Sequence, residues 1–380
     1  MKKAHTWISL FLTIGITACA FAGCSGSQEA SPGASSGDAP GTPSASGGAY
    51  LIAENNWGQG VGALDLIENE ARYTVTTFGC DFQAYNDEFN ADKMKTNIQG
   101  MLSASTDGIL FFGAVPTLIP VVAQMCEQAK VPFVIFDQIP LDAQVIEQLE
   151  ANPYYVGSVG TDNYAAGASM AKYALDNGSK NAIILGGAVG DSVHDARIEG
   201  FTAAFEQSGG TIAGIGHCDS PASGTTKCDD LIAASPNADT IYALTGDYAT
   251  SALTALDNHS ASMSVYVTDS TANTLQDLKD GKVVVGDGGA SIATTLAATL
   301  LVNWLDGNQL KTDEGKAPYL NTIVAFPIYA DSADDYQKYW LAENPLTAEQ
   351  LQALRGPDVT MADIDAFVSG YSLETIVAGR

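Results

Sequence analysis

The stretch Lys130-Val131-Pro132-Phe133-Val134-Ile135-Phe136-Asp137 decides the fold of this 380-residue chain. Its apolar residues run without interruption and end in a carboxylate. A strand that is apolar on both faces has to be covered on both faces, which is the environment of a strand inside a parallel sheet. The carboxylate then lies at the carboxyl end of the strand, which is where open parallel sheets bind their ligands.

Apolar runs of the same kind recur along the chain and alternate with stretches of helical periodicity. The runs expected to be strands are 50–53, 73–78, 108–112, 182–185, 211–215, 240–244, 265–267 and 282–285. Residues 163–175 and 191–205 are expected to be helices. Strand–helix–strand repetition produces parallel sheets with right-handed crossovers. We therefore predict an α/β protein with two lobes, each built on a doubly wound parallel sheet.

Several aspartates follow the predicted strands, as Asp137 does. Asp269 and Asp287 come at the ends of two later strands, and Asp191 and Asp247 follow two others. Since Asp also caps helix N-termini, position alone leaves two interpretations open, a helix cap or a ligand contact. We expect caps at Asp191 and Asp247. We expect ligand contacts at Asp137 and Asp269, because of the family resemblance described below.

Arg197 is placed on the apolar side of its predicted helix, because Val193, Phe201 and Phe205 recur with it every four residues. A buried guanidinium is unfavourable unless it is paired or meets a ligand. Flanked by aspartates from neighbouring strand ends, it would present forked donors between acceptors, which suits vicinal hydroxyls. A purely structural ion pair is the alternative. If Arg197 donates hydrogen bonds to the ligand, Arg197→Ala should abolish binding and leave the unfolding temperature of the ligand-free protein nearly unchanged.

Aromatic side chains follow the first two predicted strands. Asn56 and Trp57 come after the first strand, and a Trp in this position can stack on the apolar face of a sugar ring or simply cover the core. Phe82 and Tyr85 are weaker candidates for the same role. His194 lies about one helical turn before Arg197, where it would either line the cleft or lie at the surface, and we expect the surface.

Four motifs in combination resemble the type I periplasmic sugar-binding proteins, the ribose- and galactose-binding family of ABC importers. The resemblance covers 49–328. The strand 130–137 is similar to one whose aspartate binds sugar hydroxyls, and Gly160–Gly167 is similar to the helix start at the crossover between lobes. Ala196–Phe201 resembles the helix whose arginine grips the sugar, and Val265–Asp269 resembles a strand with a second sugar-binding aspartate.

The resemblance implies a monomeric solute-binding protein, with no enzymatic activity, cofactor or metal ion, that captures a sugar or similar polyhydroxylated molecule and delivers it to an ABC permease. Its two lobes, 49–160 plus 289–325 and 161–288 plus 326–380, would be joined by a hinge of three segments, and the second would carry a helical tail. Gln138 and Asp287 depart from the family pattern, which favours Arg and Gln there. The expected ligand contacts are Asn56, Trp57, Asp137, Gln138, Arg197, Asp269 and Asp287.

Two other functions remain open. A nucleoside- or signal-binding lipoprotein that feeds a sensor kinase would need aromatic rings on both faces of a flat base. An extracellular hydrolase would use two carboxylates of the cleft, such as Asp137 and Asp269, on a glycosidic bond.

The N-terminal residues have the features of an export signal. Lys2 and Lys3 precede an apolar run, and Phe21-Ala22-Gly23-Cys24 resembles a bacterial lipobox, whose cysteine receives a lipid. Cys19 follows a second sequence of this kind. We therefore expect a signal peptide over 1–23 and an extracytoplasmic protein held at the membrane by a lipid on Cys24. Residues 24–48 are mostly Ser, Gly, Ala and Pro and are expected to be a disordered linker.

The chain is strongly acidic, with 17 Lys and Arg against 44 Asp and Glu and a net charge of −27. This charge excludes nucleic acid as a partner, because a phosphate backbone requires a basic surface. Cys80, Cys126, Cys218 and Cys228 lie in the predicted lobes. A local disulfide between Cys218 and Cys228 and free buried thiols are the two alternatives for an exported chain.

Overall fold

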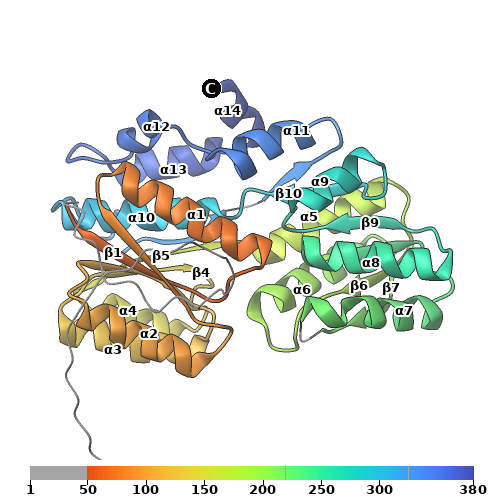
Figure 1. The fold of residues 1–380 in the computed structure, drawn as a ribbon, viewed down its shortest axis with the longest axis horizontal. Coiled ribbons are helices and arrows are strands. Elements are labelled where there is room, and N and C mark those ends of the chain that lie inside the picture. The colour runs from red at the N-terminus through yellow and green to blue at the C-terminus, as the bar shows by residue number, and fades with distance from the viewer. Residues whose placement is uncertain (1–48, 219, 324) are drawn as a thin grey trace, which may run out of the picture. The chain divides into compact units, whose positions relative to one another are not determined.

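The computed structural model describes residues 49–218, 220–323 and 325–380, which form two lobes, each with one six-stranded sheet between layers of helices (Figure 1). The prediction of an α/β fold with two parallel-sheet lobes is confirmed. The predicted signal peptide, linker and lipidation residue Cys24 lie outside the described residues. No helix within the described ranges has the length and apolar character needed to cross a bilayer.

The first lobe contains a fully parallel sheet in the order β11-β5-β4-β3-β1-β2. Its strands are β1 (Leu51–Asn56), β2 (Asp81–Asn86), β3 (Gly108–Phe112), β4 (Phe133–Asp137), β5 (Tyr155–Thr161) and β11 (Tyr319–Ile323). Its helices are α1 (Gly62–Thr77), α2 (Ala91–Ser103), α3 (Ile119–Ala129), α4 (Ala143–Glu150) and α10 (Ile292–Leu305), with a 3₁₀ turn, η1 (Pro116–Leu118).

Strand β4 shows why this part of the sequence forms a central strand. Val134 and Phe136 pack into the core that includes α1 and α10, whereas Phe133 and Ile135 pack into the core that includes α2 and α3. Helices α1 and α10 cover one face of the sheet, and α2, α3 and α4 cover the other (Figure 1). An uninterrupted apolar run is therefore required here, because both faces of the strand are buried.

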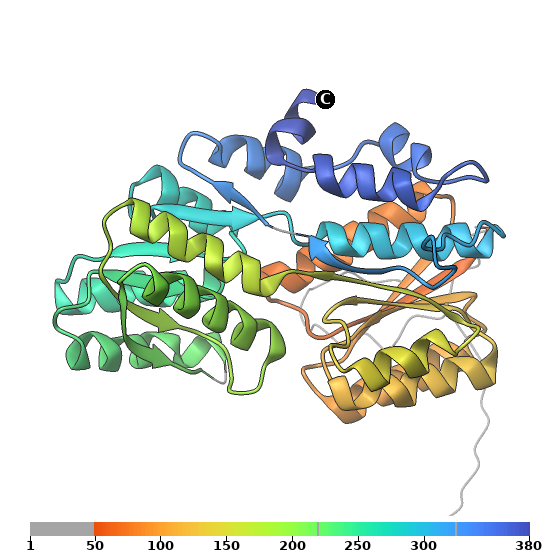
Figure 2. The ribbon, with the colours of Figure 1, turned by 180° about the vertical axis from the view of Figure 1, so that it is seen from behind.

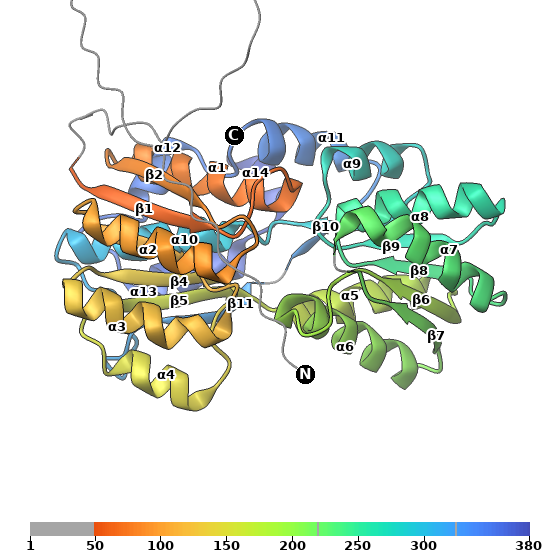
Figure 3. The same cartoon turned by 60° about the horizontal axis from the view of Figure 1, so that its bottom comes forward.

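The second lobe repeats the arrangement in the order β12-β10-β9-β8-β6-β7, with only the β10–β12 pair antiparallel. Helices α5 and α6 lie on one face of the sheet and α7 and α8 on the other (Figure 3). The strands are β6 (Asn181–Leu185), β7 (Thr211–Gly216), β8 (Thr240–Ala243), β9 (Ser264–Val267), β10 (Val285–Gly288) and β12 (Phe326–Ile328). The helices are α5 (Asn163–Asp176), α6 (Ser192–Gln207), α7 (Gly224–Ala234), α8 (Gly246–His259) and α9 (Ala272–Lys279), with a 3₁₀ turn, η2 (Pro221–Ser223).

The chain passes between the lobes three times, as the predicted hinge requires. It crosses from β5 to α5, returns from β10 to α10, and crosses again from β11 to β12. The first and third crossings run together, since the backbone N–H of Asp162 donates to the carbonyl of Ile323 over 2.9 Å.

Two of the predicted strands are wrong. Residues 73–77, rich in β-branched side chains, form the end of α1, and Phe78 is its C-cap. Four residues of this helix, Ile67, Ala71, Thr74 and Val75, are buried at helical spacing. Burial of this face overrides local strand propensity. The strand in this part of the chain is instead β2, which follows α1, lies at the edge of the first sheet and has no apolar run. The strand predicted over 282–285 begins only at Val285.

The C-terminal residues form helices, as predicted, and connect the two lobes. They are α11 (Ala333–Tyr336), a π-helix η3 (Gln337–Ala342), α12 (Ala348–Ala353), α13 (Met361–Gly370) and α14 (Leu373–Ala378). Lys279 of the second lobe pairs with Asp334 over 2.9 Å, but Arg355 pairs with Asp306 of the first lobe over 2.6 Å. Our assignment of the entire tail to the second lobe therefore needs correction, because its later helices lie over α1 and α10 (Figure 2).

The cysteines of the lobes behave as core residues. Cys80, Cys126 and Cys228 are free and buried. Because the Cys228 thiol is free, the disulfide considered for Cys218 and Cys228 is not formed.

Candidate functional site

A cavity of about 870 Å³ is lined by residues of both lobes. The lining segments follow the carboxyl ends of strands β1, β4, β8, β9 and β10. This is where ligands bind in open parallel sheets. Of the seven predicted ligand contacts, the cavity lining includes Trp57, Asp137, Gln138, Arg197 and Asp269. Asn56 and Asp287 are not part of it.

Asp137 and Asp269 occupy equivalent places in the two lobes. Asp137 ends β4 with φ of 62°, and Asp269 follows β9 with φ of 58°. A left-handed backbone costs a non-glycine residue on the order of 1 kcal/mol, and such outliers cluster at ligand sites. Burial, followed by the nearby Asp269 charge, raises the pKa of Asp137 to about 7. Asp137 therefore carries a carboxyl group that is poorly solvated and close to a second acid.

Arg197 is held in the cavity wall by three hydrogen bonds. Its Nη1 donates to the Asp269 carboxylate over 2.7 Å and to the carbonyl of Leu244 over 2.9 Å, and its Nε donates to Asn163 Oδ1 over 2.9 Å. Its residue surface is only 4% exposed. Burial disfavours its charge, but the adjacent Asp269 keeps the pKa of Arg197 above its ordinary value. The buried guanidinium is thus part of an ion pair with the partly exposed Asp269 and also part of the cavity lining.

Close packing of α5 against α6 brings Asn163 to Arg197. A Cβ atom on Gly167 would lie 2.1 Å from the Arg197 carbonyl oxygen, and one on Gly200 would lie 2.0 Å from the Tyr164 carbonyl oxygen. Only glycine allows the two backbones to approach this closely. Both glycines lie in the motifs that carried the family resemblance, which explains why the motifs and the site coincide.

Asp287 lies behind the cavity. It is 1% exposed, and its Oδ1 accepts a hydrogen bond from the backbone N–H of Asp269 over 2.7 Å. Burial, followed by the charge of Asp269, raises the pKa of Asp287 to about 8. Its position makes Asp287 a support for the left-handed backbone of Asp269, and the ligand contact predicted for it stays a prediction.

Asn56 is also a supporting residue. It is fully buried, donates to the carbonyl of Leu64 over 2.8 Å and accepts from the N–H of Gly58 over 3.3 Å. Both ends of its amide are occupied by the loop that leads into α1, and the ligand contact predicted for Asn56 stays a prediction. Trp57 in this loop does line the cavity. Its ring packs edge to face against the ring of Phe89, with 6.1 Å between the ring centroids.

Gln138 connects the lobes at the cavity. Its Oε1 accepts a hydrogen bond from Ser192 Oγ of the second lobe over 3.4 Å. The adjacent Asp191 caps α6 by accepting from the backbone N–H groups of Val193 and His194, which confirms the predicted cap. Asp247 was also predicted to be a cap, but Thr245 occupies the N-cap of α8 and Asp247 lies in the first turn.

Sequence reasoning missed several cavity residues. Phe89 follows the unrecognised strand β2, so no pattern indicated it. His194 was expected at the surface, but it is half-buried in the cavity wall, with Nδ1 3.4 Å from Asp191 Oδ2. Burial alone would raise the pKa of Asp191, but hydrogen bonds and charge from His194 lower it to about 2. Phe82 and Tyr85 lie within β2, away from the cavity lining.

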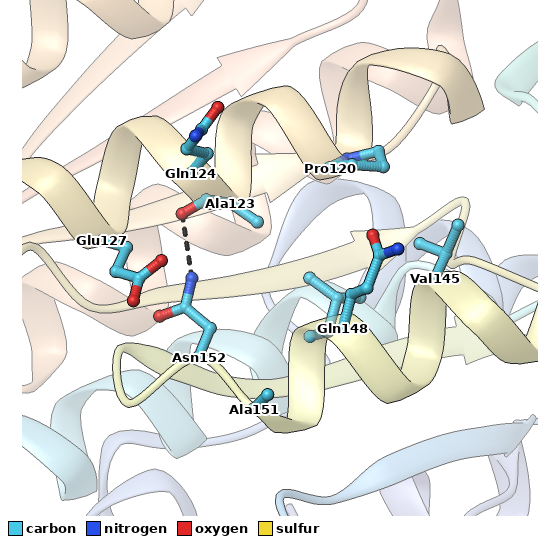
Figure 4. A pocket seen from close by; sticks show the side chains of 9 residues that line it. Pro120, Ala123, Gln124, Glu127, Val145, Gln148, Ala151 and Asn152 are labelled. Carbon is cyan, nitrogen blue, oxygen red and sulfur yellow. Dashed lines mark hydrogen bonds between the residues drawn. The ribbon is translucent and has the colours of Figure 1, made fainter.

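A second depression of about 390 Å³ lies between α3 and α4 of the first lobe (Figure 4). Gln124, Glu127 and Gln148 line it, and the Asn152 amide donates to the carbonyl of Ala123 over 2.9 Å. Its polar groups come from one lobe and from helix surfaces, whereas the cavity between the lobes collects residues from both sheets.

Comparisons with known proteins agree with this fold. Residues 54–309 match the family profile of the periplasmic binding protein domain. The chain resembles a galactofuranose-binding protein, with 17% identity and a TM-score of 0.67 over 78% of this chain and 99% of the other. It also resembles a solute-binding protein from Actinobacillus succinogenes with bound D-allose. The identity is 19% and the TM-score is 0.67, over 76% of this chain and 100% of the other.

A solute-binding protein from Burkholderia graminis in complex with D-arabinose shares 20% identity with this chain, with a TM-score of 0.64 over 75% of this chain and 96% of the other. No curated protein matches the sequence. The profile match spans well over half of the chain, and the solved structures share its arrangement of two lobes. The chain therefore belongs to the periplasmic binding protein family and has the fold of the type I periplasmic sugar-binding proteins.

Proposed function

We propose that this protein captures a sugar or a similar polyhydroxylated small molecule in the cavity between its lobes and delivers it to an ABC permease. The observation that carries the proposal is the convergence of Asp137 from the first lobe and the Arg197–Asp269 pair from the second lobe on one cavity. Carboxylate acceptors beside a guanidinium donor match vicinal hydroxyl groups, which both donate and accept. The sugars named for the structural neighbours support this ligand class.

Binding would follow from movement of the lobes about the three crossings. Closure excludes water and strengthens the charge-assisted hydrogen bonds of the acids and the guanidinium. Trp57 would cover the apolar face of the ring. The 82° angle between Trp57 and Phe89 disfavours the alternative nucleoside ligand, which needs parallel faces on both sides of a base. Because the similar solved structures are described as binding proteins, we propose a binding protein and not a hydrolase.

We further propose that the protein acts outside the cytoplasm, tethered by a lipid on Cys24. The family profile supports the compartment, and the sequence before Cys24 supports the tether. Replacement of Cys24 by Ser should release the protein from the membrane fraction. Retention of that variant at the membrane would contradict the tether.

A thermal-shift screen with neutral sugars and polyols, followed by calorimetry, tests the binding function. At least one compound should raise the unfolding temperature, and Trp57→Ala and Gln138→Ala should each weaken its binding at least tenfold. Tyr329→Ala provides the control, because Tyr329 is an exposed aromatic residue outside the cavity. Equal loss of binding in all three variants would contradict the assignment of the site.

A further inference from the structure

The cavity between the lobes has more acidic than basic groups. Its described lining contains five aspartates, namely Asp65, Asp137, Asp191, Asp247 and Asp269. The basic side chains in the same described lining are one arginine, Arg197, and one histidine, His194. A cavity of this composition has a negative potential, and the net charge of −27 for the whole chain adds to it.

The basic groups are already used within the protein. Arg197 Nη1 lies 2.7 Å from Asp269 and its Nε is bonded to Asn163, so the arginine and Asp269 neutralise each other. His194 lies against Asp191, which also receives two backbone N–H groups at the start of α6. Each basic side chain of the described lining is therefore already paired with one acid of the cavity.

Asp137 and Asp247 lack such compensation. Both line the cavity, and the carboxylate of neither accepts a hydrogen bond from the described residues. Asp247 lies in the first turn of α8, where the helix dipole offsets part of its charge. Asp137 has no helix N-terminus of its own, and Asp269 and Asp191 both face it, with Arg197 as the opposing cation. Asp137 is therefore the least compensated acid of the cavity.

We propose that the ligand is a polyhydroxylated molecule with a positively charged amino group, as in an amino sugar, and that its ammonium binds Asp137. This inference rests on the proposed function and narrows its ligand class. Closure around a neutral sugar would remove Asp137 from water with Arg197, already paired with Asp269, as its opposing cation in the described lining, which disfavours the charge of Asp137. An ammonium supplies both hydrogen-bond donors and the missing charge.

Calorimetry at pH 7 with matched sets of compounds tests the inference. The sets are glucosamine, N-acetylglucosamine and glucose, and the corresponding three compounds of galactose. We expect at least one free amine to bind tenfold or more tightly than both its N-acetyl and its hydroxyl counterpart. Asp137→Asn should reduce this preference to about twofold or less. Asp331→Asn, which removes an exposed acid outside the cavity, should keep it.

The failures of the two proposals are distinguishable. If the neutral sugars bind as well as the amines, or if Asp137→Asn leaves the preference intact, the amine assignment is overturned and the sugar-binding function stands. If no compound of any set binds, the result counts against both. Should Asp137→Asn fail to fold, added NaCl decides, because amine binding should weaken with salt while neutral-sugar binding should not.

Discussion

The site depends on a few residues whose backbone conformations are unfavourable and are held in place by their surroundings. Asp137 and Asp269 both have left-handed backbones, which Asp tolerates better than most residues because of its short polar side chain. Asp287 holds one of these conformations through the N–H of Asp269. Paired acids at matching strand ends and a buried arginine indicate a site prepared for a ligand.

The stability of the ligand-free protein should depend on the ionisation of Asp137. The pKa of Asp137 in the folded protein, about 7, lies above its ordinary value, because the folded state favours the protonated carboxyl group. The stabilisation of the folded state by this proton is therefore lost as the pH rises from about 4 to 7. Asp137→Asn should therefore raise the unfolding temperature by roughly 2–4 °C at pH 8 and change it little at pH 4. Scanning calorimetry at both pH values measures this, and a gain confined to pH 4 would contradict it.

Arg197 should contribute to stability as well as to binding. Arg197→Ala leaves the partly exposed carboxylate of Asp269 without its partner, which should cost less than the about 3–5 kcal/mol of a fully buried pair but more than the loss of an exposed pair. From the sequence we expected Arg197→Ala to leave the unfolding temperature unchanged. From the ion pair in the structure we expect this variant to lose stability. Arg72→Ala, which breaks an exposed pair with Glu68, should cost at most about 1 kcal/mol. Denaturant unfolding compares the two, and equal losses would contradict the structural role of Arg197.

At the scale of elements, the contact between α5 and α6 positions the arginine. Gly167 and Gly200 let the helices approach to backbone contact, and this packing directs Arg197 and Asn163 toward the cavity. The contact thus connects a packing feature of the fold to the geometry of the site.

Gly200→Ala should therefore disturb both stability and binding. The added methyl group would meet the Tyr164 carbonyl at 2.0 Å, and overpacking of this kind costs about 1–3 kcal/mol. Gly370→Ala at the end of α13 is the matched control, because a Cβ there meets no atom within 4 Å. Chemical denaturation should show destabilisation for the first variant alone. Equal stability of both would mean that the helices separate freely.

Sequence patterns predicted some elements well and others not at all, for physical reasons. The apolar runs of β3 and β4 and the four-residue spacing on α6 are signals of burial on both faces and on one face, respectively. Strand β2 has neither signal because it is an edge strand, so the position of Phe89 could not be predicted. Asn56 and Asp287 had the right residue types, but only the structure shows that backbone groups occupy them.

At the scale of the whole molecule, the tail ties the hinge to both lobes. Trp340 is fully buried and donates to Ser291 Oγ over 3.2 Å, and Ser291 donates to Glu70 over 2.6 Å. Ser291 follows the crossing from β10 to α10, so the tail contacts a segment about which the lobes would move. Burial raises the pKa of Glu70 to about 8.

Ligand binding should reduce the radius of gyration, because the lobes close on the cavity. Small-angle X-ray scattering with and without saturating ligand measures this change. For Trp57→Ala at the same ligand concentration, the radius of gyration should decrease less, because a smaller fraction of the protein has ligand bound. An unchanged radius at proven saturation would contradict closure.

The most direct measurement is a crystal structure of the protein with the tightest-binding compound of the sugar and amino-sugar screens. The account predicts that the compound lies in the cavity between the lobes, with polar atoms within about 3.2 Å of the Asp137 carboxylate and of the Arg197–Asp269 pair. A compound bound in the depression between α3 and α4, or bound without contact to either acid, would contradict it.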